Sequence, residues 1–333
     1  MEEYYTFNEA VSDAFAEPSE ETRRFIGSFP KDFASSQIEA LIAALGGDFA
    51  KLEAIRNARR TLPLNSPKVY ISELNIEADS RPLRIRIYTP PGSINSKRNI
   101  LVYYHGGGWT INCIESCERF CRDFCADSDS IVVVPDYRLA PENRYPAANI
   151  DCFETFKWVV KNAVIIGGSR DKIYLAGDSA GGHLAVSTAI AARDDRTVIS
   201  KPAGISMFYP ALDLADTARL SYHRYADGYC LNAKLMRLFI NAYTGDGSNA
   251  LKASPFYSNL EGLSRVLLIS SQFDILHDES SEFAKKLSSA EVPVRYIAFN
   301  GASHLFITQK GMDGAYSRAL KELIDFTKQN RHV

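Results

Sequence analysis

The feature that most constrains this chain is an alternation, from residue 100 onward, of short apolar runs with longer amphipathic stretches. Continuous runs of β-branched and aromatic residues are typical of strands buried on both faces, and apolar residues three or four positions apart indicate helices. The pattern predicts an α/β fold with a mostly parallel central sheet flanked by helices. We expect strands at ILVYYH (100–105), IVVVPDY (131–137), KIYLAGDS (172–179), GISMFYP (204–210), RVLLISSQFD (265–274) and VRYIAFN (294–300).

The segments outside this alternation predict the rest of the architecture. Residues 1–60 have helical spacing, interrupted by Pro18 and Pro30, and KVYISELNIEA (68–78) and RPLRIRIYTP (81–90) alternate apolar and polar residues as half-buried antiparallel strands do. Residues from about 211 to 256 are too long for a plain connection and form a candidate lid. With 333 residues, 46% of them hydrophobic, the chain can bury the core of one large domain with a small cap.

Charge and hydropathy exclude several classes of function. The formal net charge of −2 gives no indication of a nucleic-acid-binding surface or a polybasic membrane patch. The first residues, MEEYYTFNEA, lack the basic and apolar regions of a signal peptide, and no apolar run approaches the roughly 20 residues that span a bilayer. We therefore expect a soluble, cytoplasmic protein.

Four of the six cysteines recur at every fourth residue, at Cys113, Cys117, Cys121 and Cys125. On a helix they would form one apolar stripe, and free cysteine behaves as a small buried hydrophobe. A soft-metal site is the alternative, but the spacing matches no common zinc pattern and no histidine is near. The sequence therefore favours a helix packed on the sheet, and no metal site is expected.

The segment GDSAG, residues 177–181, places a G-x-S-x-G motif between a predicted strand and a predicted helix. A serine at such a sharp turn projects its hydroxyl group, and the N-terminus of the following helix favours negative charge nearby. Ser179 is therefore the candidate nucleophile.

A serine nucleophile needs a base, and the base needs an orienting acid; in this arrangement both follow the serine in the chain. Of the six histidines, His304 fits best, because it lies in a loop just after the last predicted strand. Asp274 comes directly after the preceding strand and is favoured as the acid over Asp278, which we expect in the first turn of the next helix. The histidines set aside are His105, His183, His223, His277 and His332.

Three consecutive glycines in HGGGW, residues 105–109, follow the first strand of the alternation. Such a run is costly unless the backbone must approach something closely. A loop of this kind, together with the amide of Ala180 after the nucleophile, supplies the N–H donors of an oxyanion hole in lipases and esterases. The glycines therefore predict such a hole.

Taken together, these motifs resemble the hormone-sensitive-lipase-like (HGGG) carboxylesterases of the α/β-hydrolase superfamily, and the layout is similar to that of bacterial acetyl esterases. The matching segments, in family order, are HGGGW, DYRLAPE (136–142), YPAA (145–148), GDSAGG, FDILHDE and GASHLF. The resemblance implies an α/β-hydrolase fold in which residues 61–333 form the catalytic domain and residues 1–60 and about 211–256 form a helical cap. One departure is Ile275, where the family commonly has proline.

Carried over to this sequence, the resemblance implies a catalytic triad of Ser179, Asp274 and His304. It implies oxyanion donors from Gly107, Gly108 and Ala180, with Gly106 shaping the turn. Arg138 and Glu142 of DYRLAPE would be charges held near the site by partners, with a structural role.

The resulting hypothesis is a serine carboxylesterase that hydrolyses short-chain acyl esters without a metal or organic cofactor. An amidase or acyltransferase could use the same triad, and a non-hydrolytic binding protein could share the fold, although binding members typically lack the base histidine. The lid aromatics could line an acyl pocket or, as the sequence favours, pack the lid on the core; they are Tyr222, Tyr225, Tyr229, Phe239 and Tyr243. A homodimer is left open.

Overall fold

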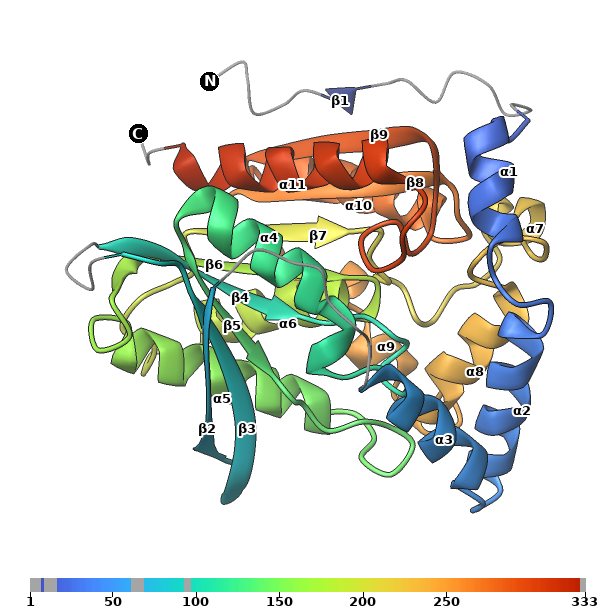
Figure 1. Ribbon diagram of the computed structural model, residues 1–333, viewed down its shortest axis with the longest axis horizontal. Coiled ribbons are helices and arrows are strands. Elements are labelled where there is room, and N and C mark those ends of the chain that lie inside the picture. Colours follow the sequence, from blue (N-terminus) through green and yellow to red (C-terminus); the bar gives the residue numbers. More distant parts are fainter. Residues whose placement is uncertain (1–6, 9–16, 61–68, 93–96, 330–333) are drawn as a thin grey trace.

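The computed structural model describes residues 7–8, 17–60, 69–92 and 97–329. Within these residues, nine strands form one twisted sheet in the order β1-β9-β8-β7-β6-β4-β5-β3-β2 (Figure 1). The strands are β1 (Phe7–Asn8), β2 (Tyr70–Ala78), β3 (Arg81–Thr89), β4 (Arg98–Tyr104), β5 (Ile131–Pro135), β6 (Gly168–Asp178), β7 (Gly204–Phe208), β8 (Val266–Phe273) and β9 (Val294–Ser303).

The pairing of the strands confirms the mixed sheet predicted from the sequence. Strand β3 pairs antiparallel with both β2 and β5, and all other neighbours are parallel. Because parallel neighbours need long crossovers, helices separate the strands from β4 to β9. The carboxyl ends of β4, β6, β8 and β9 consequently lie at the same edge of the sheet, where each is followed by a loop or turn that bears a candidate functional residue.

Helices cover both faces of the sheet (Figure 1). Alternate residues of β4 show the division: Ile100 and Val102 join the core on the side of α5 and α6, while Leu101 and Tyr103 join the core on the side of α4 and α11. The helices are α1 (Glu20–Gly27), α2 (Phe33–Leu45), α3 (Ala50–Arg59), α4 (Glu118–Ser128), α5 (Ala147–Asn162), α6 (Ala180–Asp194), α7 (Leu220–Arg224), α8 (Ala233–Thr244), α9 (Ala250–Ala253), α10 (His277–Ser289) and α11 (Asp313–Lys328).

The stripe of cysteines packs against the sheet, as the sequence favours. Cys113 precedes a short 3-10 helix, η2 (Ile114–Cys117), which leads into α4. All four cysteines of the stripe are free and buried, and Cys117, Cys121 and Cys125 lie in the core with Phe120 and Phe124. Burial raises the pKa of the Cys113 thiol to about 11 and that of Cys125 to about 12, so both are protonated packing groups at neutral pH.

Helices from the two segments predicted to form the cap, residues 1–60 and about 211–256, meet beside the sheet. Helix α2, from the N-terminal region, packs against α8, from the segment 211–256, and Figure 1 shows α1, α2, α3, α7 and α8 gathered at one end of the sheet. The N-terminal region is not helical throughout, because Phe7–Asn8 form strand β1 beside β9. This correction reflects pairing with a distant strand, which local spacing does not encode; the helical spacing at residues 9–16 lies outside the described residues.

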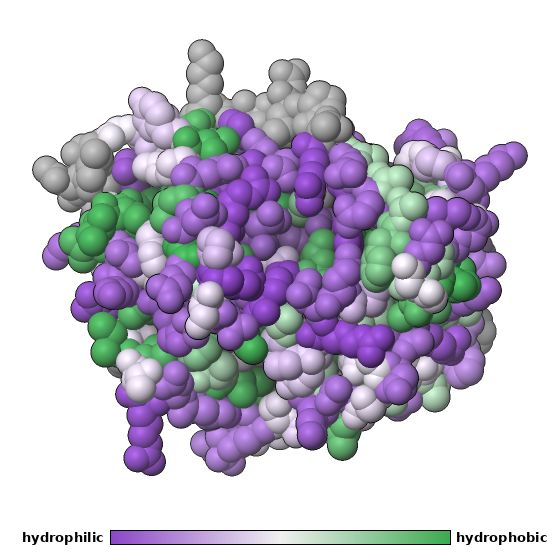
Figure 2. Space-filling model, turned by 90° about the horizontal axis from the view of Figure 1, so that it is seen from below, coloured by the Kyte–Doolittle hydropathy of each residue, from purple (hydrophilic) through white to green (hydrophobic). Residues whose placement is uncertain are grey.

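The face of the molecule shown in Figure 2 is predominantly polar. On the face in Figure 2, hydrophilic residues prevail and the hydrophobic ones form small, separate patches. In the part of the chain that the structure describes, no helix combines the length and apolar character needed to cross a bilayer.

Candidate active site

The candidate nucleophile lies on a strained turn between β6 and α6. Ser179 has φ 54° and ψ −120°, a combination that costs a non-glycine residue about 1–3 kcal/mol. Its N–H donates to the carbonyl of Phe208 at 2.9 Å, which ties the turn to β7. Space for the turn depends on glycine, because a Cβ at Gly181 would lie 1.9 Å from the carbonyl oxygen of Tyr104. The sequence of this segment therefore allows a geometry that most side chains would prevent.

Ser179, His304 and Asp274 form one chain of hydrogen-bonding groups. The Ser179 Oγ lies 3.0 Å from His304 Nε2, and His304 Nδ1 lies 2.6 Å from Asp274 Oδ2. The other carboxylate oxygen, Asp274 Oδ1, accepts from the amide of Leu276 at 3.1 Å. Asp274 directly follows β8 and His304 directly follows β9, so neighbouring parallel strands bring them together. All three side chains are buried, at 2–7% exposure, with Ser179 the most accessible.

The glycine loop after β4 lies against this group. Gly107 and Gly108 have φ values of 109° and 56°. A Cβ at Gly107 would lie 2.7 Å from the Asn112 Cγ, and one at Gly108 would lie 2.3 Å from the Phe239 ring. Among the described residues, the amides of Gly107 and Gly108 have no hydrogen-bond acceptor, and both residues line the same pocket as Ser179 and Ala180. Backbone donors are thus left available beside the serine.

A buried carboxylate joins the glycine loop to the nucleophile turn. Asp178 Oδ1 accepts from the Tyr103 hydroxyl group at 2.8 Å and from the Gly106 amide at 3.0 Å. Burial raises the pKa of Asp178, although both hydrogen bonds oppose that shift. Asp178 was not among the predicted site residues; its one signal in the sequence is its place immediately before the serine of the motif.

Arg56 of α3 fixes the loop from the outside and was also missed. Its guanidinium donates to the carbonyls of Thr110 and Ala140, at 2.8 and 2.9 Å, and pairs with Glu142 and Glu53. Burial lowers the pKa of Arg56, but its bonds to Glu142 and Glu53 outweigh this effect and raise the pKa overall. Because its partners other than Glu53 lie more than fifty residues away in the chain, no local signal could have identified its role.

The DYRLAPE segment has the structural role expected from the resemblance. Glu142 is held by Arg56, as described above. Arg138 binds Asp151 through its guanidinium and its backbone amide, at distances of 2.8–3.2 Å, and also pairs with Asp79. Both charges therefore have partners that hold the segment in place.

The other histidines have structural environments. His183 accepts from Trp109 Nε1 and donates through Nε2 to the carbonyl of Ala253, and burial lowers its pKa to about 4. His105 stacks on Tyr137, and burial lowers its pKa as well. Both rings are neutral at physiological pH and link the glycine loop to surrounding elements.

Asp278, the other candidate acid, and His277, a histidine close to Asp274 in the chain, both lie at the start of α10. Asp278 lies in the first turn of α10, as expected, and accepts from the amide of Ser221 at 2.8 Å, away from His304. His277 is the first residue of that helix, and its Nδ1 lies 3.0 Å from the carbonyl oxygen of Ser271. The structure therefore brings Asp274, and not Asp278, to His304.

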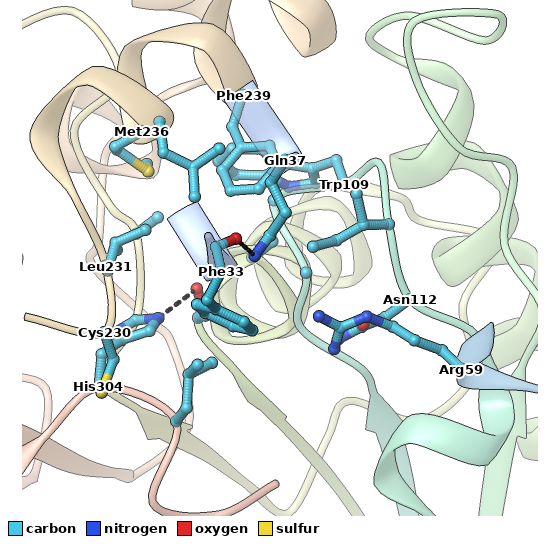
Figure 3. A pocket seen from close by; sticks show the side chains of 18 residues that line it. Phe33, Gln37, Arg59, Trp109, Asn112, Cys230, Leu231, Met236, Phe239 and His304 are labelled. Carbon is cyan, nitrogen blue, oxygen red and sulfur yellow. Dashed lines mark hydrogen bonds between the residues drawn. The ribbon is translucent and has the colours of Figure 1, made fainter. Parts of the chain in front are cut away.

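A narrow pocket opens over Ser179 and His304 (Figure 3). Its cavity volume is about 40 Å³. One side is apolar, formed by Leu231, Met236 and Phe239, whereas the other carries Arg59 and Asn112 (Figure 3). Helix α2 covers the pocket with Phe33 and Gln37.

Of the five lid aromatics, Phe239 alone is among the residues described as lining this pocket. Tyr243 stacks on Trp109, with ring centroids 4.5 Å apart, and Tyr225 and Tyr229 contact Phe273. Most of the set therefore packs the segment onto the core, which is the alternative that the sequence favours. Among the described residues, no cluster of three or more histidine, cysteine or acidic side chains is arranged to hold a metal ion.

Comparison with known proteins finds similarity to the alpha/beta hydrolase fold and to esterases. Residues 101–308 match the alpha/beta hydrolase fold family. An arylesterase of Saccharolobus solfataricus is 31% identical over 239 residues, which cover 71% of this chain and 76% of that protein. An ethyl acetate hydrolase of Pseudomonas putida is 31% identical over 242 residues, again 71% and 76% of the two chains. The structure of a hyperthermophilic esterase from the archaeon Pyrobaculum calidifontis aligns with a TM-score of 0.79 and 29% identity, covering 94% of this chain and 98% of that one.

Proposed function

This chain belongs to the alpha/beta hydrolase family, as one of its hormone-sensitive-lipase-like (HGGG) carboxylesterases, and from that membership we propose that it hydrolyses short-chain acyl esters through an acyl-enzyme intermediate on Ser179. The enzyme class is a serine carboxylic ester hydrolase. The observation that carries the proposed roles is the continuous arrangement of Asp274, His304 and Ser179 beside amides that have no other acceptor in the described chain.

Attack begins with His304 as general base. Its Nδ1–H donates to Asp274, which leaves Nε2 as the acceptor for the Ser179 hydroxyl proton. The Ser179 oxygen forms a bond to the ester carbonyl carbon as the proton moves to Nε2. Asp274 remains ionised, holds the ring in this tautomer and stabilises the imidazolium.

The tetrahedral intermediate places negative charge on the former carbonyl oxygen. We assign its stabilisation to the amides of Gly107, Gly108 and Ala180, which line the pocket beside Ser179. The N-terminus of α6 adds a favourable partial charge at the same point. Removing one donor from such a hole typically costs about 2.7–4 kcal/mol of transition-state stabilisation.

Collapse of this intermediate completes the first half of the reaction. The bond to the alcohol oxygen breaks, and the alcohol leaves with the proton from His304. Water then attacks the acyl-enzyme, gives its proton to His304, and releases the carboxylic acid and free Ser179. Every step uses groups of this chain and water.

The small cavity supports a short acyl chain. A volume of about 40 Å³ accommodates a few water-sized groups, and the apolar side formed by Leu231, Met236 and Phe239 suits a methyl or short alkyl group. The similarity to an ethyl acetate hydrolase points in the same direction.

We extend the proposal to domain organisation and location. Residues 1–60 and 211–256 act as a cap on a catalytic domain formed by residues 61–333, supported by the packing of α2 on α8 and by the pocket residues that both supply. A cytoplasmic location is supported by six free cysteines, since reduced thiols are typical of that compartment.

The test is hydrolysis of 4-nitrophenyl esters from acetate to palmitate by the wild type, by Ser179→Ala and by the control Ser289→Ala. Ser289 is an exposed serine at the end of α10, so the control removes a hydroxyl group far from the predicted chemistry. We expect activity that falls with chain length, a loss of several orders of magnitude in Ser179→Ala, and wild-type activity in Ser289→Ala.

Two outcomes would count against the proposal. Folded wild-type protein that cleaves no ester of the series would favour a binding function for the pocket. Activity highest on long chains would contradict the short-chain assignment. Amides and alternative acyl acceptors, tested in parallel, measure the amidase and acyltransferase alternatives.

A further inference from the structure

The polar side of the pocket contains a cation, Arg59, that has no counter-ion in the part of the chain that the structure describes. Arg59 is the last residue of α3 and is partly buried, and its side chain lines the pocket with Asn112, away from Leu231 and Met236 (Figure 3). Among the described residues, Arg59 forms no hydrogen bond or ion pair. Arg56, one turn earlier on the same helix, is in contrast held by two carboxylates and two carbonyl groups.

The described residues around Arg59 do not neutralise its charge. Burial lowers the pKa of Arg59, and the acidic group that acts on it electrostatically is the Cys113 thiol. Burial also raises the pKa of Cys113 to about 11, so that thiol is uncharged at neutral pH. An arginine stays protonated under these conditions. A partly buried charge without a partner is unfavourable, and an arriving anion would relieve that cost.

Asn112 adds a second polar side chain at the same place. Its Oδ1 is a buried acceptor with no hydrogen-bond partner within the described part of the chain, so this oxygen cannot bind an anion, and only the NH₂ group of Asn112 can donate to one. Its side chain packs against Gly107, since a Cβ there would lie 2.7 Å from Asn112 Cγ. The polar side of the pocket therefore adjoins the loop that we assign to the oxyanion.

We propose that Arg59 and Asn112 form a carboxylate-binding subsite, so that the preferred substrates are short esters carrying a free carboxylate besides the ester group. The inference rests on the proposed esterase function and names the substrate class of the same site. Arginine suits this role because its planar guanidinium can bind a carboxylate through two parallel N–H···O bonds. The Asn112 amide supplies a further donor through its nitrogen.

Two isosteric pairs of esters test the proposal and distinguish the two positions of the carboxylate. In the first pair the acyl side differs: monoethyl succinate ends in a carboxylate, and ethyl 4-methylpentanoate ends in an isopropyl group of similar shape. 3-Acetoxypropanoate and 3-methylbutyl acetate differ in the same way on the alcohol side. Hydrolysis is followed in a pH-stat for the wild type, for Arg59→Gln and for the control Arg60→Gln, which removes an exposed neighbouring charge.

In at least one pair, we expect wild-type kcat/KM to favour the charged ester. Arg59→Gln should lower that charged-to-neutral ratio by about 10- to 100-fold, mainly through KM, because a hydrogen bond to a charged group is lost. Arg60→Gln should change the ratio by less than about twofold. The subsite would be overturned if the wild type prefers the neutral esters and Arg59→Gln leaves the charged-to-neutral ratio of kcat/KM unaltered. The esterase function would still stand in that case.

Calorimetric titration of the Ser179→Ala protein separates the two proposals further. Binding of monoethyl succinate or 3-acetoxypropanoate that weakens about 10-fold or more on adding Arg59→Gln supports the subsite, even if the wild type hydrolyses nothing. Undetectable binding of both charged esters, or binding that is insensitive to Arg59→Gln, contradicts it.

Discussion

Removing the Asp178 side chain should uncouple the glycine loop from the nucleophile turn. In Asp178→Ala, the Tyr103 hydroxyl and the Gly106 amide both lose their acceptor in a fully buried site. Leaving a buried donor unsatisfied costs about 1–3 kcal/mol, so the two together cost about 2–6 kcal/mol. Removing a carboxylate that burial already disfavours offsets part of this, and we expect a net loss of about 2–4 kcal/mol in the free energy of unfolding.

Asp178→Asn is the matched control. Both donors bind Oδ1, and the amide oxygen of asparagine can take that position, so we expect its stability to stay within about 1 kcal/mol of the wild type. Urea unfolding followed by tryptophan fluorescence measures the difference in the free energy of unfolding.

On protein that remains folded, kcat should fall about 10²- to 10³-fold in Asp178→Ala and far less in Asp178→Asn, because a displaced glycine loop loses oxyanion contacts.

Either of two results would contradict this prediction for Asp178. Asp178→Ala as stable as the wild type would mean that the two donors find other acceptors or that their bonds contribute little. Asp178→Asn as destabilised as Asp178→Ala would mean that the negative charge matters, and not the acceptor oxygen.

Three further predictions concern the acid, a buried glutamate and the motif glycine. Asp274→Asn should lower kcat about 10⁴-fold with little change in KM, because His304 loses its orienting acceptor; an unchanged kcat in steady-state assays would reject the role. Burial raises the pKa of Glu279 well above its ordinary value of 4.5. The contribution of Glu279 to the free energy of unfolding is therefore fully present below pH 4.5 and lost as the pH rises through the folded-state pKa. Between pH 4 and 9, the free energy of unfolding, measured by denaturant titration, should fall less for Glu279→Gln than for the wild type. Gly181→Ala should abolish folding or activity, because its Cβ would lie 1.9 Å from a strand carbonyl, whereas Gly314→Ala, with nothing within 4 Å, should leave thermal stability within about 1 kcal/mol of the wild type.

The parts of the fold predictable from sequence are those with local signals. The apolar runs predict β4 to β9 because burial on both faces requires continuous hydrophobicity, and the spacing of α5 and α11 follows from one apolar face each. Ser179 and the glycine loop could be found because strand-to-helix turns impose their own residue types. Asp274 and His304 could be chosen because each directly follows a strand.

The residues that sequence reasoning missed act over long distances. Arg56 binds Glu142, and Arg59 lines a pocket with Asn112. The helical spacing of α3 does not distinguish Arg56, which forms ion pairs, from Arg59, which forms none with the described residues. Strand β1 exists through its pairing with β9, nearly three hundred residues away. Such features depend on tertiary contacts, which a single sequence does not specify.

The central claim is that Ser179 forms the covalent intermediate. Diethyl 4-nitrophenyl phosphate transfers a phosphoryl group to an activated serine, and peptide mapping by mass spectrometry locates the adduct. We expect stoichiometric modification of Ser179, with loss of esterase activity in parallel, and no modification in Ser179→Ala or His304→Ala. An adduct on another residue, or full inactivation with Ser179 unmodified, would contradict it.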